Sequence, residues 1–143
     1  MTKEGRMPKH ELTASVPVVG RTEKVFNLEE RTALFGEAVI RFCKAIPQTV
    51  VTEPLIRQIV RSSTSVGANY CEADDAISRK EFRQKIGTCK KEARETKHWL
   101  RMIATADPNQ AGKARLLWQE ANELHLIFAS IFRKLSTKKP STK

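Results

Sequence analysis

The spacing of apolar residues constrains this chain more than any other feature of its sequence. Apolar positions alternate at intervals of three and four in residues 28–46, 52–77 and 78–103, and in a last stretch that follows Pro108 and ends near Leu135. This spacing places them on one face of an α-helix. The last three helices are long and joined by short links, which forces neighbours to run antiparallel. No alternating period-two run competes. We therefore predict an all-α protein that forms an antiparallel up-down four-helix bundle.

Cap residues mark where two of these helices should begin. Pro54 suits the first turn of the second helix, because a missing N–H costs nothing there, and Thr52 or Glu53 is expected to cap it. Ser78 and Glu81 have the spacing of a capping box, in which two otherwise unpaired backbone N–H groups find acceptors. The third helix should therefore begin just after Ser78.

Only the central part of the chain carries the helical period. Residues 1–26 have none and are expected to form a flexible N-terminal arm, residues 27–136 the bundle, and residues 137–143 a frayed basic tail. No stretch reaches the roughly 20 consecutive apolar residues of a membrane span, and the first residues are poor material for a signal peptide. We expect a soluble, cytoplasmic protein without membrane contact.

The chain shows no motif typical of a catalytic or metal centre. Its three histidines share no ligand spacing, and none stands beside a Ser or Cys in a nucleophile motif. Glu72, Asp74 and Asp75 could bind a divalent cation, and a metal-dependent nuclease built on them is the remote alternative. Pairing with nearby Arg79 and Lys80, or exposure to water, explains this cluster more simply. The cysteines are expected to be reduced packing residues: Cys43, Cys71 and Cys89. We predict no catalytic residue, no metal and no cofactor.

The charge of the chain is compatible with an anionic partner. It contains 26 Lys and Arg against 16 Asp and Glu, a net charge of +10. On the third helix a row of cations follows the apolar positions by one residue and is interrupted only by Gly87. The row consists of Arg83, Lys90, Arg94, Lys97 and Arg101. The acids of this helix gather on the other flank. The row could bind the phosphates of nucleic acid, or it could pair with acids on neighbouring helices or subunits.

A second unusual surface lies on the second helix, on a face roughly 130° from its apolar side. The residues of this face follow the same alternation of four and three: Gln58, Ser62, Ser65, Asn69 and Glu72. Small, mostly uncharged side chains allow another backbone to approach closely. The face therefore favours a contact with another subunit, and an ordinary solvent-exposed face is the alternative.

Three segments resemble a known family: QIVRSSTSVGANYCEA (residues 58–73), SRKEF (78–82) and KKEARETKHWLRMI (90–103). They are similar to the four-helix-bundle family encoded in intervening sequences of bacterial large-subunit ribosomal RNA genes, which includes the accessory variability determinant of diversity-generating retroelements. The most specific match is to a pattern of the type R-x-x-x-S-x-x-x-N-x-x-E, formed by Arg61, Ser65, Asn69 and Glu72. Further matches are Glu92, Glu95 and the Trp99-Leu100 pair.

The resemblance implies a homopentameric, barrel-like ring with no known enzymatic activity, and we include Arg61 in the predicted subunit interface. For the retroelement members it also implies a basic surface that associates with RNA and with a reverse transcriptase. We therefore expect a non-catalytic basic adaptor that binds structured RNA or a nucleic acid–protein complex. A protein–protein scaffold without nucleic-acid binding is the alternative.

Overall fold

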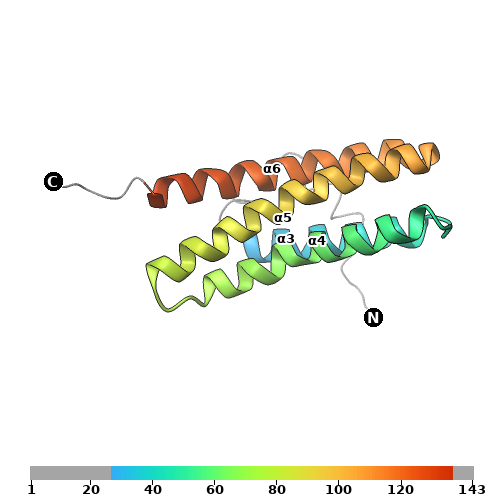
Figure 1. The fold of residues 1–143 in the computed structure, drawn as a ribbon. Helices are drawn as coiled ribbons and strands as arrows, with labels where there is room; N and C mark the ends of the chain where they lie inside the picture. Colours follow the sequence, from blue (N-terminus) through green and yellow to red (C-terminus); the bar gives the residue numbers. More distant parts are fainter. Residues whose placement is uncertain (1–26, 137–143) are drawn as a thin grey trace.

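The computed structural model describes residues 27–136, so the predicted arm and basic tail lie outside the described residues. Its helices are α3 (Leu28–Lys44), α4 (Thr52–Asp74), α5 (Arg79–Ala106) and α6 (Ala111–Ser136), with a short 3-10 helix, η1 (Pro108–Gln110), between the last two. No strand occurs between residues 27 and 136. The prediction of an all-α four-helix bundle is confirmed (Figure 1).

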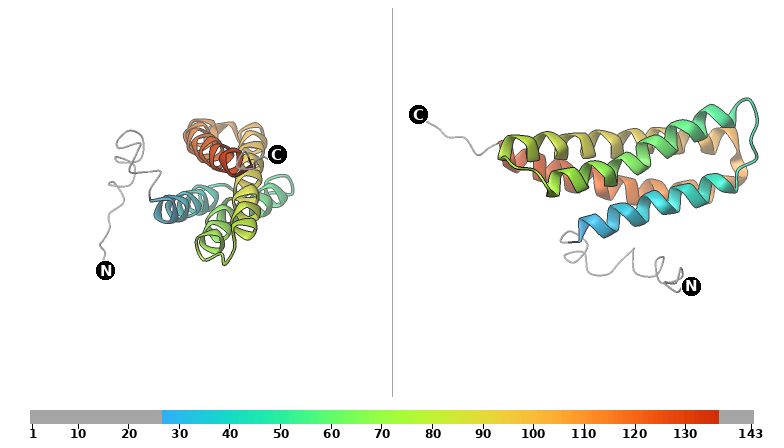
Figure 2. Two further views of the ribbon diagram at one scale, coloured as in Figure 1. Left: turned by 90° about the vertical axis from the view of Figure 1, so that its left-hand side faces the viewer. Right: turned by 90° about the horizontal axis from the view of Figure 1, so that it is seen from below.

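Successive helices run in opposite directions and pack side by side (Figures 1 and 2). The contacts of α5 with α4 and with α6 are the most extensive, while α3 packs on α4 and meets α6 over a shorter stretch. In the end-on view of Figure 2, α5 lies between α4 and α6. One flank of α5 therefore faces α4 and the other faces α6. None of the helices in the described part of the chain is both long and apolar enough to traverse a bilayer.

The predicted apolar faces meet in one core, with one exception at the end of α4. Val39, Val66 and Phe128 are among the side chains with no exposed surface. Ile77, by contrast, is 93% exposed because α4 ends at Asp74 and the chain turns before α5 begins. The extension of the second helix to Ile77 is therefore wrong, since apolar spacing carries no signal for that turn.

The helix starts follow the predicted chemistry with two differences. Ser78 caps α5, with its Oγ accepting from the N–H of Glu81 at 3.0 Å. The Glu81 carboxylate, however, accepts from the N–H of Ile77 at 3.2 Å instead of returning to Ser78. At α4 the N-cap is Val51, which has no capping side chain, so the predicted cap at Thr52 or Glu53 is wrong; Thr49 Oγ1, in the preceding link, accepts from the N–H groups of Val51 and Thr52, each at 3.1 Å. The Thr52 hydroxyl instead donates to the Pro47 carbonyl and ties the preceding link together.

The three cysteines are free, and two of them pack in the core. Burial raises the pKa of Cys43 to about 11 and that of Cys89 to about 12, so both thiols stay protonated at neutral pH. Cys71 is exposed on α4, on the side that faces α3. The prediction of a packing role is therefore wrong for Cys71.

A buried ion pair joins α3 to α6. Arg31 stands among the apolar residues of α3, and its side chain is only 7% exposed. Its Nε and Nη2 donate to the two carboxylate oxygens of Glu120 at 2.7 and 2.8 Å, and Nη2 also donates to Glu123 at 2.6 Å. Burial opposes the charge of Arg31, but the hydrogen bonds and charges of the two carboxylates raise its pKa above the usual value. This pair closes the bundle where α3 and α6 meet over only a short stretch.

Arg31→Ala should lower the free energy of unfolding by about 3 kcal/mol, because it leaves the mostly buried Glu120 carboxylate without its partner. Arg57→Ala is the matched control. It removes an ion pair with Glu53 in which the side chains are 67% and 55% exposed, and it should cost less than about 1 kcal/mol. Urea denaturation measures both, and equal losses would contradict the closing role of Arg31.

Candidate nucleic-acid interface

The cations predicted to bind phosphate form one row on the flank of α5 that faces α6. We call Arg83, Lys90, Arg94, Lys97 and Arg101 the basic stripe. Arg94 and Arg101 are exposed, whereas the other three are half-buried. The stripe is therefore turned partly toward α6 and is not a row that projects wholly into solvent.

The part of α6 that meets the basic stripe contains no carboxylate. The α6 residues that face the stripe each come directly after an inward-facing apolar residue of that helix. We call them the α6 strip: Trp118, Asn122, His125, Ala129, Phe132 and Ser136. The acids Glu120 and Glu123 lie on the other flank of α6, where they bind Arg31. No stripe residue forms an ion pair with any residue between 27 and 136. The described part of the subunit therefore leaves the charge of the stripe without a counter-ion.

At one end of the stripe, cations pack on an aromatic ring. The guanidinium of Arg83 lies 3.8 Å from the ring centroid of Phe132, and Nζ of Lys90 lies 5.0 Å from it. Arg83 also donates to the hydroxyl of Ser136, while its buried Nε has no hydrogen-bond partner in the described part of the chain. Gly87 interrupts the stripe for a steric reason, since a Cβ there would lie 2.9 Å from Cε1 of Phe132. These cation–ring contacts hold the positive groups without neutralising them.

In the middle of the stripe, Lys97 reaches across to three polar or aromatic groups of α6. Its Nζ donates to Oδ1 of Asn122 at 2.8 Å, lies 3.5 Å from Nδ1 of His125 and stands 5.1 Å from the ring centroid of Trp118. Burial, and then the charge of Arg94, lowers the pKa of Lys97. Burial lowers the pKa of His125 as well, followed by the charges of three stripe cations. The lowered pKa favours the neutral form of His125, next to an excess of positive charge.

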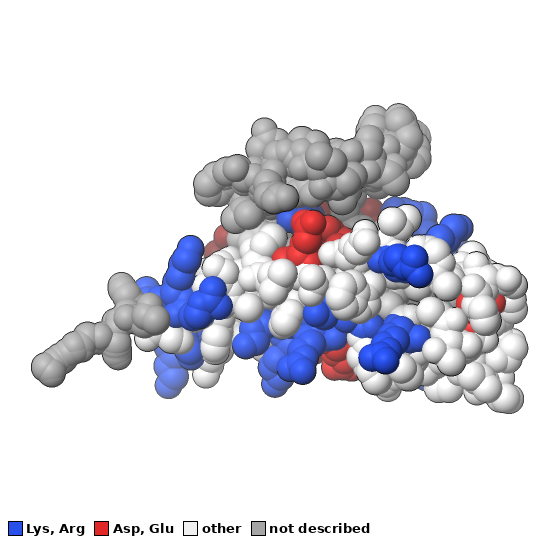
Figure 3. Space-filling model, turned by 90° about the horizontal axis from the view of Figure 1, so that it is seen from above, with Lys and Arg blue, Asp and Glu red and all other residues white. Residues whose placement is uncertain are grey.

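The outer surface of these two helices is also basic. In Figure 3 the Lys and Arg side chains gather along the side where α5 and α6 lie, with few acids between them. Lys91 of α5 and Arg115 of α6 are exposed, as are Arg94 and Arg101. This face of the two helices is therefore predominantly basic.

The acidic flank of α5 is occupied by α4. Arg61 binds Glu92 at 3.3 Å and also pairs with Glu95, and Glu95 accepts from Nε1 of Trp99 at 2.9 Å. The hydrogen bond from Trp99, and then the contacts with Arg61, lower the pKa of Glu95. Arg61, predicted at a subunit interface, therefore joins two helices of one subunit.

Some residues of the predicted polar face of α4 also make contacts within the subunit, and others remain on the surface. Ser62 is fully buried, and its hydroxyl lies 2.8 Å from that of Thr96 on α5, so its placement between subunits is wrong. The small size of Ser62 permits the close approach of α5 within the subunit.

The other residues of this face differ in their contacts. Glu72 pairs with Lys85 of α5. Gln58 is exposed, and Asn69 is half-buried and donates to the backbone oxygen and hydroxyl of Ser65 at 2.8 and 3.0 Å. Only Gln58, Ser65 and Asn69 keep surface for another subunit without an ion pair inside this one.

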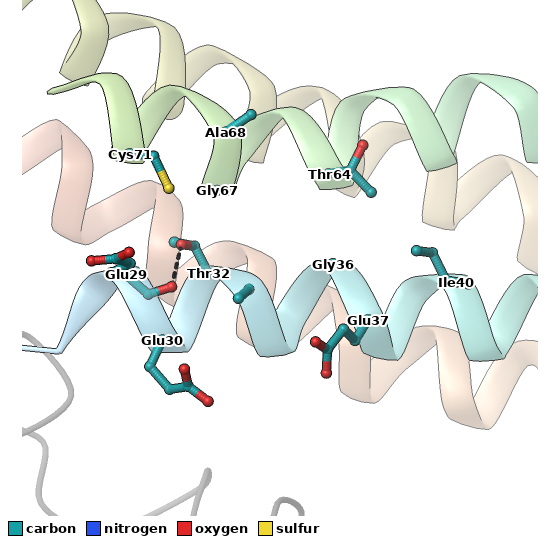
Figure 4. Close-up of a pocket in the computed structure, with 11 residues that line it drawn as sticks. Glu29, Glu30, Thr32, Gly36, Glu37, Ile40, Thr64, Gly67, Ala68 and Cys71 are labelled. Atoms are coloured by element: carbon teal, nitrogen blue, oxygen red, sulfur yellow. Dashed lines mark hydrogen bonds between the residues drawn. The ribbon is translucent and has the colours of Figure 1, made fainter. Parts of the chain in front are cut away.

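A shallow groove of about 330 Å³ runs between α3 and α4, away from the basic stripe. Gly36, Gly67 and Ala68 are among the small residues that line it, and Figure 4 shows the Cys71 sulfur pointing toward α3. Its other lining residues include three carboxylates: Glu29, Glu30 and Glu37. No Lys or Arg lines the groove, so the bundle carries opposite charge on two separate faces.

Sequence reasoning missed Arg31 and the α6 strip. A charged residue among apolar positions of the first helix was the available signal for Arg31. For the α6 strip, the available signal was that each of its residues comes directly after an apolar position of the last helix. Among the described residues, no group of three or more His, Cys, Asp or Glu side chains is arranged to hold a metal ion.

These features define an antiparallel four-helix bundle with one basic flank that lacks internal counter-ions. The family model described as 23S rRNA-intervening sequence protein matches residues 26–134. The chain therefore belongs to this family, as the resemblance indicated. A similar solved structure is the crystal structure of a protein with unknown function from the S23 ribosomal protein family of Bacteroides thetaiotaomicron VPI-5482. It is 27% identical, with a TM-score of 0.66 over 77% of this chain and 98% of that one. No curated protein matches the chain.

Gly87→Ala should give no gain in stability, although Ala usually exceeds Gly by about 1 kcal/mol inside a helix. The new Cβ would force the Phe132 ring to move from beneath Arg83. Gly112→Ala on α6 is the matched control, because a Cβ there meets nothing within 4 Å and should stabilise the helix by up to about 1 kcal/mol. Thermal unfolding compares the two, and equal gains would contradict the tight α5–α6 contact.

Proposed function

We propose that this protein is a non-catalytic, cytoplasmic homo-oligomer whose α5–α6 face binds structured RNA, either free or held by a protein such as a reverse transcriptase. The observation that carries the proposal is a basic stripe packed against an α6 strip that has no carboxylate. The family description refers to the ribosomal RNA intervening sequence and names no binding partner, so the proposal rests on the charge of this face and on the resemblance. The suggestion of a reverse transcriptase rests on the resemblance to retroelement members alone.

The charge balance of α5 favours an external anion. Residues 79–101 contain nine Lys and Arg and three Asp and Glu, a net charge of +6. Two of those acids, Glu92 and Glu95, already bind Arg61 of α4. A-form RNA exposes phosphates and 2′-hydroxyl groups that Lys and Arg on a helix surface can contact without reading the bases. We therefore expect salt-sensitive binding with little sequence preference.

Assembly into a ring would multiply weak contacts with a long RNA. The uncharged surface left at Gln58, Ser65 and Asn69 supports a contact between subunits, and the resemblance favours five copies. Each subunit of such a ring would carry its own basic stripe. Several stripes on one particle would raise the apparent affinity above that of a single subunit.

A scaffold without RNA is the second candidate, and the α3–α4 groove favours it. The groove is bordered by Glu29, Glu30 and Glu37, so the basic stripe of another copy could bind there by charge complementarity. A contact of this kind is heterologous, and it closes into a ring when its rotation permits. The basic stripe would then be buried in the contact between subunits and could not bind RNA.

The double change Arg94→Gln and Arg101→Gln separates the two candidates. Both side chains are exposed, so the bundle should keep its stability. If each binds one phosphate, the slope of log affinity for an RNA hairpin against log salt should fall in magnitude by about 1.4–1.8 in the double variant. Fluorescence anisotropy at several salt concentrations measures this slope, and intact RNA after incubation with Mg²⁺ checks the absence of catalysis.

The matched control removes the same charge from α3, with Arg41→Gln and Lys44→Gln, two exposed positions away from the stripe. In this control, the slope of log affinity against log salt should change less than in the stripe double variant. Equal slopes in the two double variants would contradict a specific RNA face. An oligomer that dissociates in the stripe variant, with unchanged RNA binding, would favour the scaffold.

The mass of the protein in solution tests assembly. Light scattering behind a sizing column should give a multiple of 16.2 kDa. Asn69→Lys should raise the dissociation concentration of the oligomer by more than about tenfold, because it places an unpaired charge in the contact. Gln119→Lys on the exposed surface of α6 adds the same charge and should leave the mass unchanged. A monomer mass at micromolar concentration would contradict the proposal.

A further inference from the structure

The basic stripe meets the α6 strip in its middle, around Asn122 and His125. Lys97 reaches His125 and Asn122 across the α5–α6 contact. The charges of Lys90 and Arg94 also act on the His125 ring. We call these three cations, with Asn122 and His125, the α5–α6 cation cluster. It combines side chains of two helices that follow one another in the chain.

The cations of this cluster have no carboxylate partner within residues 27–136. Within residues 27–136, Lys97 finds a neutral amide oxygen and a neutral ring nitrogen as its polar partners, and Lys90 and Arg94 form no ion pair. The like charges of Lys90, Arg94 and Lys97 therefore repel one another along one flank of α5, where Arg94 is exposed and the two lysines are half-buried. A phosphate group can relieve this repulsion, because its oxygens accept several charge-assisted hydrogen bonds at once.

We propose that the α5–α6 cation cluster binds a phosphate group of nucleic acid and that His125 takes up a proton as the phosphate binds. This inference rests on the proposed function and makes its binding site specific. Trp118 favours nucleic acid over a free phosphate compound, because the residue is 39% exposed beside Lys97 and an exposed indole ring can stack on a nucleotide base.

Proton uptake follows from the surroundings of His125. The charged groups that act on it are Lys97, Arg94 and Lys90 of α5, and its neighbours one turn away on α6, Ala121 and Ala129 among them, are uncharged. In the free protein burial and these cations hold the pKa of His125 below its usual value. A bound phosphate brings negative charge and draws Lys97 toward itself, and both effects favour the protonated ring. The bound-state pKa is therefore higher than the free-state pKa.

The sign of the pH dependence is fixed by this difference. Binding is tighter wherever the complex carries a proton that the free protein lacks, so affinity rises as pH falls through the bound-state pKa. The gain levels off below the free-state pKa. A difference of one pKa unit between the two states corresponds to about a tenfold gain in affinity at low pH. Above the bound-state pKa the affinity should not vary with the state of His125.

The test measures affinity for a fluorescein-labelled RNA hairpin between pH 5.5 and 8.5 at constant ionic strength, for wild type, His125→Gln and His98→Gln. His98 is the matched control, an exposed histidine of α5. Wild type and His98→Gln should bind several-fold more tightly at the acid end, and His125→Gln should lose this gain. In parallel, NMR follows the His125 imidazole of the wild-type protein without ligand, with the hairpin and with inorganic pyrophosphate.

A higher His125 pKa with the hairpin, and a smaller change with pyrophosphate at equal phosphate concentration, supports the inference. RNA binding with an unchanged His125 pKa overturns the inference and leaves the proposed function standing. A higher pKa with pyrophosphate but no RNA binding overturns the nucleic-acid assignment, and indicates a site for a free phosphate compound. No response to either ligand overturns the site, and absence of RNA binding at every pH and salt concentration also overturns the proposed function.

Discussion

The packing of α5 between two antiparallel neighbours governs the rest of this structure. Each flank of α5 carries one sign of charge, and the two neighbours treat these flanks differently. On the acidic side, α4 supplies Arg61, which binds Glu92 and Glu95. On the basic side, α6 supplies rings, amides and a histidine but no carboxylate. The charges at the α4–α5 contact are thus neutralised inside the subunit, and the cations at the α5–α6 contact are not.

This asymmetry agrees with where α6 places its acids. Glu120 and Glu123 occupy the opposite flank, where they hold the buried Arg31 of α3. They join α3 to α6, whose contact is less extensive than that of α5 with either neighbour, and they are unavailable to the basic stripe. Among the described residues, a flank of cations without ion pairs therefore coexists with a paired charge in the interior. Cation–ring contacts at Phe132 and Trp118 orient the stripe without cancelling its charge.

Much of the fold could be predicted from the sequence because it depends on period and on local chemistry. The three-four spacing identified the core faces, and Ser78 marked the start of α5. The end of α4 escaped prediction because Ile77 continues the apolar spacing into a turn. The stripe was recognised as a row, but its inward tilt toward α6 depends on how two helices pack. Ser62 was misplaced for a related reason, since a small polar residue suits a close contact within a subunit as well as between subunits.

The central claim is that RNA covers the α5–α6 face, and lysine footprinting tests it most directly. Acetylation of the protein, read by mass spectrometry, reports the accessibility of individual lysines with and without an RNA hairpin. The account predicts that RNA protects Lys90 and Lys91 on α5 and leaves Lys44 on α3 as reactive as before. Equal protection at Lys44, or no protection on α5 at saturating RNA, would contradict it.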